Sequence, residues 1–177
     1  MILKIKLNHE DSKMPTKANE SDAGLDVFAH SMRIVGEEIS KGIYSQIDFI
    51  EYDCGITIEP SVEVTSWREF KEFFTFLAPR SSISKYNLVL CNGLGVLDSS
   101  YRGPILARFK YQPAASDFVF FGPERIGYSV NHKKIYQVGD RVAQLIVNLQ
   151  PTVVINRKYG EFDVTERNNG GFGSSGQ

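Results

Sequence analysis

The chain has 177 residues, 42% of them hydrophobic and 12% aromatic, which suits one domain with a sizeable core. Its net charge of −1 excludes a bulk electrostatic attraction to nucleic acid or to an anionic membrane, so any phosphate recognition has to be local. Two cysteines make no disulfide framework, three scattered histidines have no zinc-ligand spacing, and no segment suits a signal sequence or a membrane span. We therefore expect a cytoplasmic protein, or one of the host cytoplasm if the source is viral.

Strand-like segments follow one another along the first half of the chain. Residues 2–7 largely alternate between apolar and polar side chains, as in a half-buried strand. The next segments are apolar or rich in β-branched residues and are bounded by Gly or Pro. They are residues 25–29, 43–50 and 54–58. Residues 64–77 fit either one face of a helix or, near their end, a buried strand, and a helical turn that feeds a strand satisfies both patterns.

Two polar stretches of this half carry side chains that suit a ligand. Asp22 and Asp26 lie four residues apart beside a glycine, where they either cap a turn or face a cation. Arg80 is followed by two serines, one of which caps a short helix expected near residues 83–86. Free N–H groups beside an arginine form an anion site, and the alternative is an ordinary helix cap with a solvated arginine.

Residues 92–103 form a glycine-rich connection between two apolar runs, residues 88–90 and 104–109. Its glycines let the backbone bend or approach a ligand closely. Asp98 is expected at or near the tip, with Tyr101 three residues later. Local turn chemistry explains the stretch by itself, whereas a binding pocket would use both the carboxylate and the phenol.

The second half of the chain predicts a hairpin and two further strands. Residues 111–136 are long and aromatic, and a Gly-Pro-Glu turn at 122–124 divides them into two arms of an added hairpin. Residues 139–147 read as a turn followed by a strong strand. Gln144 interrupts that apolar run, so it either pairs with a neighbouring backbone or faces a ligand. Residues 151–155 are expected to form one more strand.

The chain ends in a glycine-rich tail, residues 167–177, that cannot belong to a core. Such tails are commonly disordered, but this one contains Arg167 and a single aromatic side chain, Phe172. Free N–H groups and arginine suit phosphate oxygens, and a phenylalanine ring stacks on a flat ligand ring. Together with the stretches above, the tail points to a nucleotide, the one common ligand that uses all of these groups.

Five short motifs in a fixed order now give the chain a resemblance to the homotrimeric dUTP pyrophosphatase (dUTPase) family. Each motif is weak alone, but together they span nearly the whole chain. They are Asp22-Ala23-Gly24-Leu25-Asp26, Pro79-Arg80-Ser81-Ser82, Gly95-Val96-Leu97-Asp98 through Tyr101-Arg102-Gly103, Gly139-Asp140-Arg141-Val142-Ala143-Gln144, and Arg167 through Gly170-Gly171-Phe172-Gly173-Ser174-Ser175-Gly176.

The resemblance implies an all-β subunit, a distorted jelly-roll-like β-barrel over residues 1–166, with a flexible C-terminal lid at 167–177. Three subunits would assemble around a threefold axis with active sites at their interfaces. The implied reaction is hydrolysis of dUTP to dUMP and pyrophosphate with Mg²⁺, which keeps uracil out of DNA and supplies dUMP for thymidylate synthesis. Neither nucleic acid nor membrane is an expected partner.

The resemblance also implies a role for each matched residue. Asp98 resembles the base that activates the attacking water, and Tyr101 resembles the ring that packs under the deoxyribose. Asp26 matches the carboxylate that holds Mg²⁺ through water. The implied substrate-binding residues are Arg80, Ser81, Ser82, Gln144 and Arg167 for the phosphates, Asn92, Gly95, Val96 and Leu97 in the uracil-reading hairpin, and Phe172, Gly173 and Ser174 in the lid.

Two alternatives and one departure accompany this interpretation. A dCTP deaminase shares the fold, but its catalytic glutamate would follow the aspartate hairpin, and residues 104–109 contain none. A nucleotide-sensing regulatory protein on the same scaffold is the non-enzymatic alternative. Residues 62–76 and the inserted residues 111–136 are longer than is typical of the family, and the insertion could host an additional protein partner.

Overall fold

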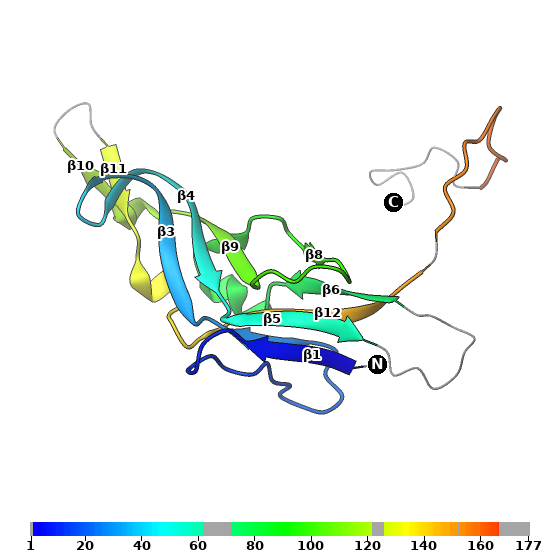
Figure 1. Ribbon diagram of the computed structural model, residues 1–177. Coiled ribbons are helices and arrows are strands. Elements are labelled where there is room, and N and C mark those ends of the chain that lie inside the picture. The colour runs from blue at the N-terminus through cyan, green and yellow to red at the C-terminus, as the bar shows by residue number, and fades with distance from the viewer. Residues whose placement is uncertain (1, 62–71, 122–125, 152, 167–177) are drawn as a thin grey trace.

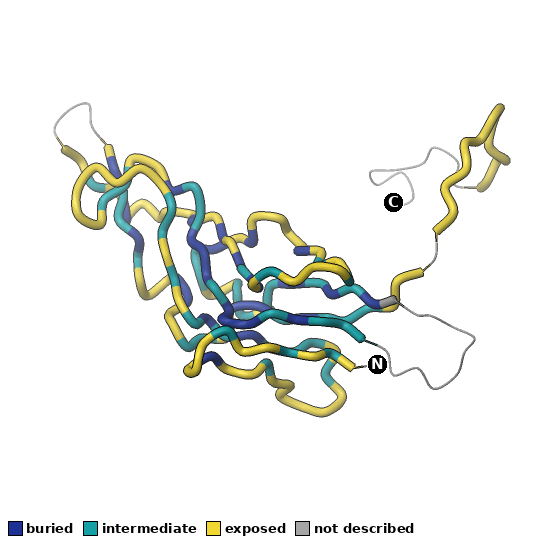
Figure 2. Tube along the Cα trace, viewed as in Figure 1, coloured by how far each residue is buried: buried dark blue, intermediate teal, exposed yellow. Residues whose placement is uncertain are grey.

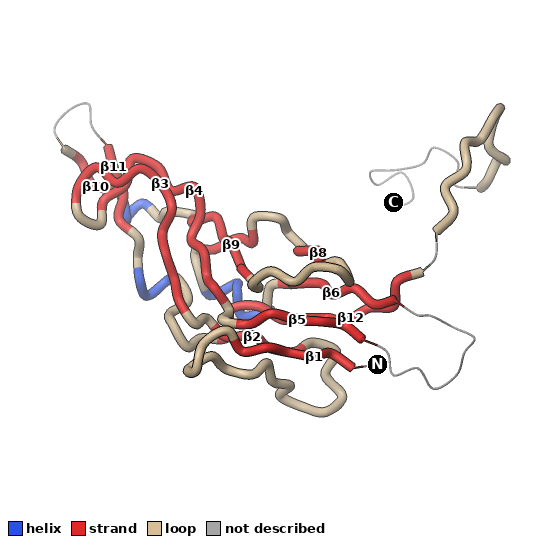
Figure 3. Tube along the Cα trace, viewed as in Figure 1, coloured by secondary structure: helices blue, strands red, loops and turns tan. Residues whose placement is uncertain are grey.

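The computed structural model describes residues 2–61, 72–121, 126–151 and 153–166. These residues form an all-β fold with only short 3₁₀ turns, as the sequence predicts (Figures 1 and 3). None of the helices in these ranges is long and apolar enough to cross a membrane.

The elements follow one another in this order along the chain. The strands are β1 (Ile2–Leu7), β2 (Leu25–Phe28), β3 (Ser31–Ser40), β4 (Ile43–Asp53), β5 (Ile56–Ser61), β6 (Glu72–Ala78), β7 (Leu88–Leu90), β8 (Gly95–Leu97), β9 (Leu106–Tyr111), β10 (Phe118–Phe120), β11 (Ile126–Ser129) and β12 (Arg141–Gln150). The 3₁₀ turns are η1 (Ser81–Lys85), η2 (Ala115–Asp117) and η3 (His132–Lys134).

Three antiparallel sheets build the body. One has the order β2-β12-β6-β8, and the second has the order β10-β11-β4-β9-β7 with β3 added on β4. Strands β1 and β5 form a small third sheet. Many neighbours are far apart in the sequence, so the arrangement depends on long-range pairing and not on consecutive hairpins alone.

One hydrophobic cluster lies between these sheets (Figure 2). Ile50 and Tyr52 of β4 alternate toward it and pack with Phe109 of β9, and Leu145 of β12 joins them from the other large sheet. Tyr52 meets Phe109 edge-on with ring centroids 5.7 Å apart, a favoured aromatic arrangement. Alternation of buried side chains therefore fixes which face of each sheet is internal.

Most predicted strands are confirmed, with boundaries shifted by a few residues. The expected helix near residues 83–86 is instead the 3₁₀ turn η1, which begins two residues earlier. The prediction of a strand at 151–155 is wrong, because residues 153–155 have no strand pairing on this chain. Strand β3 was not predicted, since its second half is polar and exposed along β4. The ambiguous segment 64–77 ends in β6, and its residues 64–71 lie outside the described residues.

The inserted segment forms the predicted hairpin. Strands β10 and β11 pair with each other, and β11 continues onto the beginning of β4. The Tyr128 hydroxyl accepts a hydrogen bond from the Ile47 amide at 2.7 Å, which fastens the hairpin to β4. The insertion thus extends one sheet at the end remote from β12, and its turn at 122–125 lies outside the described residues.

Residues 153–166 extend away from the body as an arm (Figures 1 and 2). The arm has no strand or helix, and its apolar side chains are 71–92% exposed. They are Val153, Val154, Ile155, Tyr159, Phe162 and Val164. So much exposed apolar surface on an extended segment is typical of a surface that another molecule covers.

Glu51 is a buried carboxylate held by two cross-strand arginines. Its neighbours in the β3-β4-β9 register are Arg33 and Arg108, and each donates to one of its oxygens at 2.7 Å. Burial raises the pKa of Glu51, but the hydrogen bonds from Arg33 and Arg108 outweigh it, so the pKa lies below its ordinary value of 4.5. The ionised carboxylate is therefore the form that stabilises the fold.

We predict that Glu51→Gln lowers the free energy of unfolding by about 1–3 kcal/mol, since both arginines lose a charged acceptor but remain able to reach water. The higher free energy of unfolding of the wild type should be fully present above pH 4.5. It should be lost as the pH falls through the lowered pKa of Glu51. Urea unfolding at pH 7 and at pH 3 measures both effects. Glu59→Gln, which removes an exposed pair with Lys4, is the control. An equal loss in the control would contradict the prediction.

Candidate functional site

A cavity of about 410 Å³ opens where the ends of β2, β6 and β12 meet. Its lining is mostly polar and contains two arginines and two aspartates. The lining residues are Ala18, Asp22, Ala23, Gly24, Asp26, Arg80, Ser81, Arg141, Gln144 and Ile146. Three of the five sequence motifs therefore contribute to one cavity.

Strand register brings these motifs together. In β12, Gln144 lies opposite Asp26 of β2 on one side and opposite Ala78 of β6 on the other. Asp26 is also held by two backbone hydrogen bonds with Thr16, at 2.7 and 3.1 Å. The loop between Thr16 and Asp26 closes one wall of the cavity. Asp26 and Gln144 are thus fixed by paired backbone, whereas Arg80 and Ser81 follow the end of β6 and Asp22 lies in the loop.

An irregularity at the beginning of β12 gives the cavity its second arginine. Arg141 and Gln144 are three residues apart, so a regular strand would point them to opposite faces. The pairing with β2 shifts register between Arg141 and Ala143, which inserts one extra residue. Val142 and Ala143 are both fully buried there, and both Arg141 and Gln144 line the cavity.

Asp26 is the centre of an ion-pair network in the cavity. Its Oδ1 accepts from Arg80 Nε at 2.7 Å, and its Oδ2 accepts from Arg80 Nη2 at 3.3 Å and from Arg141 Nη1 at 3.1 Å. Two guanidinium groups around one carboxylate leave an excess of positive charge beside it. Because each arginine keeps further N–H donors, an anion with several oxygens can bind here.

The other aspartate of the first motif has a local role. The Asp22 carboxylate accepts from the Asn19 backbone N–H at 2.8 Å and closes a tight turn, although it also lines the cavity. Of the two explanations for this carboxylate pair, capping therefore applies to Asp22. Asp26 faces cations, and in this structure they are arginines.

Gln144 is held against a glycine. Its Nε2 donates to the Pro79 carbonyl at 3.2 Å, and its Oε1 lies 2.5 Å from the position that a Cβ on Gly24 would occupy. Any other residue at position 24 would displace the amide. The glycine of the first motif is thus explained by close packing on Gln144.

The glycine-rich connection between β7 and β9 forms a separate group of site residues. Its middle strand, β8, crosses to the other large sheet and pairs with β6. Gly93 adopts a positive φ of 63° in the turn before it, which favours glycine. Asp98 follows β8 and is exposed, as are Asn92 and Tyr101. The Tyr101 hydroxyl donates to the Pro104 carbonyl at 3.0 Å.

These two groups of residues do not meet within one chain. Leu97 pairs with Thr75, five residues before Arg80, and β8 runs antiparallel to β6. At about 3.3 Å per residue, Asp98 lies roughly 15 Å or more from Arg80. One chain therefore holds two partial sites: a cavity with phosphate-type donors and an exposed turn with a carboxylate and a phenol.

The predicted site residues thus fall into three sets. The cavity contains Asp26, Arg80, Ser81 and Gln144, with Ser82 accepting a hydrogen bond from Arg80 at 3.3 Å. The exposed connection contains Asn92, Gly95, Val96, Leu97, Asp98 and Tyr101. Arg167, Phe172, Gly173 and Ser174 lie outside the described residues. Sequence reasoning missed Arg141, although it stands inside the fourth motif, because nothing in the sequence marks the bulge that turns it inward.

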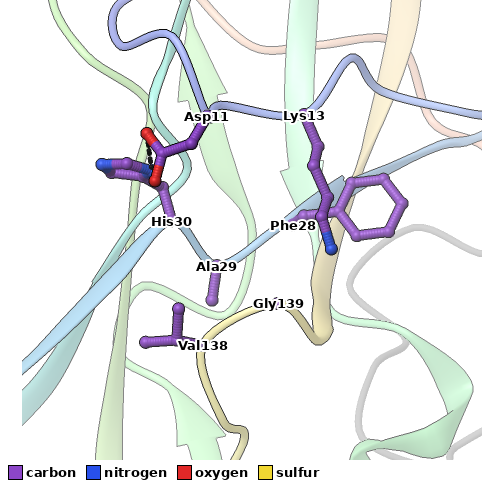
Figure 4. A pocket seen from close by; sticks show the side chains of 7 residues that line it. All are labelled: Asp11, Lys13, Phe28, Ala29, His30, Val138 and Gly139. Carbon is purple, nitrogen blue, oxygen red and sulfur yellow. Dashed lines mark ion pairs between the residues drawn. The ribbon is translucent and has the colours of Figure 1, made fainter.

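A smaller cavity of about 170 Å³ lies on the other side of the turn at Gly139 (Figure 4). The Lys13 ammonium lies over the Phe28 ring there, 5.3 Å from its centroid, and His30 Nδ1 lies 3.6 Å from Asp11. His30 also stacks on His9 with centroids 4.2 Å apart. None of the predicted site residues lines this cavity.

Comparisons with known proteins agree on one class. Curated proteins named deoxyuridine 5′-triphosphate nucleotidohydrolase match the whole chain, although no family model matches it. The one from Clostridium tetani is 29% identical over 99% of this chain and 97% of its own length. The one from Escherichia phage T5 is 29% identical over 99% of both chains, and the one from Debaryomyces hansenii is 26% identical over 99% of this chain and 88% of its own.

Solved structures of Staphylococcus phage proteins share the fold. The dUTPase of bacteriophage 80alpha in complex with dUPNHPP superposes with a TM-score of 0.69 at 21% identity, covering 99% of both chains. A variant dUTPase of phage phi11, described as coordinating a structural Mg(II) ion, has a TM-score of 0.60 at 20% identity. The fold is thus the all-β fold of the dUTPase type. Along its full length the chain is thus similar in sequence to proteins named deoxyuridine 5′-triphosphate nucleotidohydrolase and similar in fold to solved dUTPases.

We predict that Gly24→Ala weakens nucleoside triphosphate binding with little loss of stability. The added methyl would push the Gln144 amide away from the Pro79 carbonyl, whereas the core is untouched. Calorimetric titration with a non-hydrolysable nucleotide should show about three- to tenfold weaker binding, the loss of one polar contact. Unchanged affinity would show that Gln144 does not act on the ligand. Ala114→Ser, at an exposed position that does not line the cavity, is the control.

Proposed function

We propose that this protein hydrolyses dUTP to dUMP and pyrophosphate. One observation carries the proposal: the chain holds both a rigid cavity with clustered arginine, serine and amide donors and a separate turn with an exposed carboxylate and phenol. The first suits a polyphosphate and the second suits a reacting water and a sugar. Full-length relatives that bear the name of this activity support the assignment.

The cavity would bind the triphosphate. Arg80 and Arg141 offer guanidinium donors, and Ser81 and Gln144 add neutral ones. In this structure the arginines pair with Asp26, so a triphosphate would compete with that carboxylate for them. Phosphoryl-group hydrolysis depends mainly on positioning and charge neutralisation, which these residues supply.

The residues fit a Mg²⁺ ion held mostly by the substrate. Among the described residues, no group of three or more His, Cys, Asp or Glu side chains is arranged to hold a metal. The Asp26 carboxylate accepts three hydrogen bonds, and a carboxylate offers about four acceptor sites, so a water-mediated contact to Mg²⁺ fits. Mg²⁺ keeps several waters and prefers phosphate oxygens, and when bound it would neutralise the charge of the phosphates.

The exposed turn would supply the base. Asp98 would accept a proton from the attacking water as the α,β-phosphoanhydride bond breaks, a contribution of about 10²–10⁴-fold. The Tyr101 ring would pack under the deoxyribose and exclude a 2′-hydroxyl. The backbone around Val96 and Leu97, with Asn92, would contact the uracil.

A second subunit has to complete the site, because Asp98 and Arg80 of one chain lie too far apart to act on one substrate. A homotrimer with sites at its interfaces satisfies this requirement, and each subunit then gives its cavity to one site and its turn to another. The exposed apolar arm, residues 153–166, supports such an assembly, because contact with a neighbouring subunit would cover it. Residues 167–177, which follow the arm, would then act as a lid over the bound nucleotide.

The inserted hairpin gives a place for an additional partner. Phe120 of β10 and Ile126 of β11 are 71% and 56% exposed, and they lie on the sheet end remote from the cavity. A regulatory protein bound there would leave the cavity open. Such a role would add to catalysis and not replace it. Both described cysteines are free thiols, in keeping with a reducing cytoplasm.

Pyrophosphate release from dUTP, dCTP, dTTP and UTP in the presence of Mg²⁺ tests the activity. We expect a clear preference for dUTP. The Tyr101 ring under the deoxyribose would exclude the 2′-hydroxyl of UTP, and the backbone of the hairpin would match uracil. A chelator should abolish turnover. Release of ammonia from dCTP without pyrophosphate would favour the deaminase, and release of neither pyrophosphate nor ammonia from any nucleotide would favour the regulatory protein.

Subunit mixing tests the shared site. Asp98→Asn should bind nucleotide nearly as well as wild type while turnover falls about 10²–10⁴-fold, and Arg80→Ala should lose turnover through weaker phosphate binding. If each site takes Asp98 and Arg80 from different subunits, unfolding the two variants together and refolding them should restore about one quarter of wild-type activity. Mixed variants that stay inactive would contradict a shared site. Refolded single variants are the control.

A further inference from the structure

Residues 98–104 join two fixed parts of the chain and have no strand pairing within the part that the structure describes. On one side lies the end of β8, which is paired with β6. On the other side the buried Ile105 donates its backbone N–H to a carbonyl of β5 at 3.0 Å. Asp98 and Tyr101, the proposed base and the proposed sugar contact, both belong to this connection. The groups that order the connection therefore decide where these two side chains lie.

The Arg102 guanidinium binds backbone carbonyls of the connection. Its Nη1 donates to the Ser99 carbonyl at 2.7 Å and to the Tyr101 carbonyl at 2.9 Å. The Tyr101 N–H in turn donates to the Asp98 carbonyl at 3.0 Å. Tyr101 is thus held through both its N–H and its C=O, and hydrogen bonds close the backbone between Asp98 and Arg102.

The Tyr101 ring is held by the residues that follow. Its hydroxyl donates to the Pro104 carbonyl at 3.0 Å, and a Cβ on Gly103 would overlap the ring. Residues 103 and 104 therefore set the direction of the ring, whereas Arg102 sets the backbone that carries it.

A second nitrogen of the same guanidinium links the connection to the body of the chain. Arg102 Nε lies 3.6 Å from Oε2 of Glu59 in β5, and Lys4 of β1 pairs with Oε1 of that carboxylate at 2.9 Å. The hydrogen bond from Lys4, with the charges of Lys4 and Arg102, holds the pKa of Glu59 below its ordinary value of 4.5. The carboxylate is therefore ionised at neutral pH. Nη1 of Arg102 thus acts on the connection, and Nε acts on β5.

Stability alone does not account for these contacts. The side chains of Arg102 and Glu59 are 47% and 42% exposed, and ion pairs this exposed contribute little to the free energy of unfolding. Fixing a long arginine side chain also costs rotamer entropy. The result of the contacts is instead a fixed backbone path between Asp98 and Tyr101.

We propose that Arg102 is a positioning residue that fixes the Asp98 carboxylate and the Tyr101 ring relative to each other for hydrolysis. This inference rests on the proposed function, in which Asp98 is the base. A general base has to lie within hydrogen-bond reach of the water that it deprotonates, and a displacement of about 1 Å can cost about 10²-fold in rate. Without the guanidinium, the carbonyls of Ser99 and Tyr101 lose this donor, and the connection gains other backbone paths.

The test is Arg102→Ala, assayed by steady-state hydrolysis of dUTP with Mg²⁺. We expect kcat to fall about 10- to 100-fold, because the base is no longer held in one place. The affinity for magnesium tripolyphosphate, measured by calorimetric titration, should stay unchanged, since Arg102 is not among the residues that line the cavity. An unchanged kcat would overturn the proposal. Weaker tripolyphosphate binding would also overturn it, because it would make Arg102 a phosphate ligand.

Arg102→Lys separates geometry from charge. Lysine keeps the positive charge but has a single nitrogen, so it cannot hold the two carbonyls and Glu59 at once. Its kcat should therefore stay close to that of Arg102→Ala. Recovery of the wild-type kcat by lysine would overturn the proposal, because charge alone would then be sufficient. A changed oligomeric mass by light scattering, in either variant, would overturn it too, since Arg102 would then act in assembly.

A matched pair of variants tests the link to β5. Glu59→Gln removes the partner of Arg102 Nε, so it should lower kcat in the same direction and add no further loss to Arg102→Ala. Lys4→Gln removes the other cation on Glu59 and leaves Arg102 in place, so its kcat should equal that of wild type. Additive losses in the double variant, or an equal loss in Lys4→Gln, would overturn the proposed link.

Wild-type hydrolysis of dUTP, measured alongside, separates this inference from the proposed function. Absence of wild-type turnover contradicts the proposed function. Normal wild-type turnover with an unchanged kcat in Arg102→Ala contradicts only the positioning role of Arg102.

Discussion

The interaction on which the cavity depends is the ion pair between Asp26 and Arg80. It joins the end of β2 to the segment after β6, with β12 lying between the two strands. A carboxylate that is mostly withdrawn from water needs such partners, because an unpaired buried charge is strongly destabilising. The same pairing holds the Arg80 side chain at the cavity before any ligand is present. Little side-chain conformational entropy is therefore lost when a ligand binds.

The ion pair also explains how one cavity can serve both an anion and a cation. Arginines that are held by a carboxylate can exchange it for phosphate oxygens, which are comparable acceptors in larger number. The carboxylate released in this exchange is then free to face the water shell of a metal ion carried by the phosphates. In the proposed function, the positive and negative groups of the site would thus match a magnesium nucleotide as a whole and not either component alone.

The separation of the two groups of site residues within one chain follows from the sheets. Strand β8 has to run antiparallel to β6, and this direction carries Asp98 away from Arg80. No side-chain motion can cross that distance, because even a long side chain spans only about 6–7 Å from its Cα. In the proposed function, catalysis by these residues therefore requires assembly, and the extended arm with its uncovered apolar side chains supports that proposal.

The sequence by itself determined the all-β class, most strands, the aromatic hairpin and the residue types that suit a nucleotide, because alternation, turn residues and short motifs are local signals. Its motifs also grouped Asp26, Arg80 and Gln144, and the structure brings these three residues to the lining of one cavity. Only the tertiary structure decided that Asp22 caps a turn, that a bulge turns Arg141 inward, and that residues 153–155 extend without a strand partner. These outcomes depend on register and on long-range pairing, which a single sequence does not encode in any local pattern.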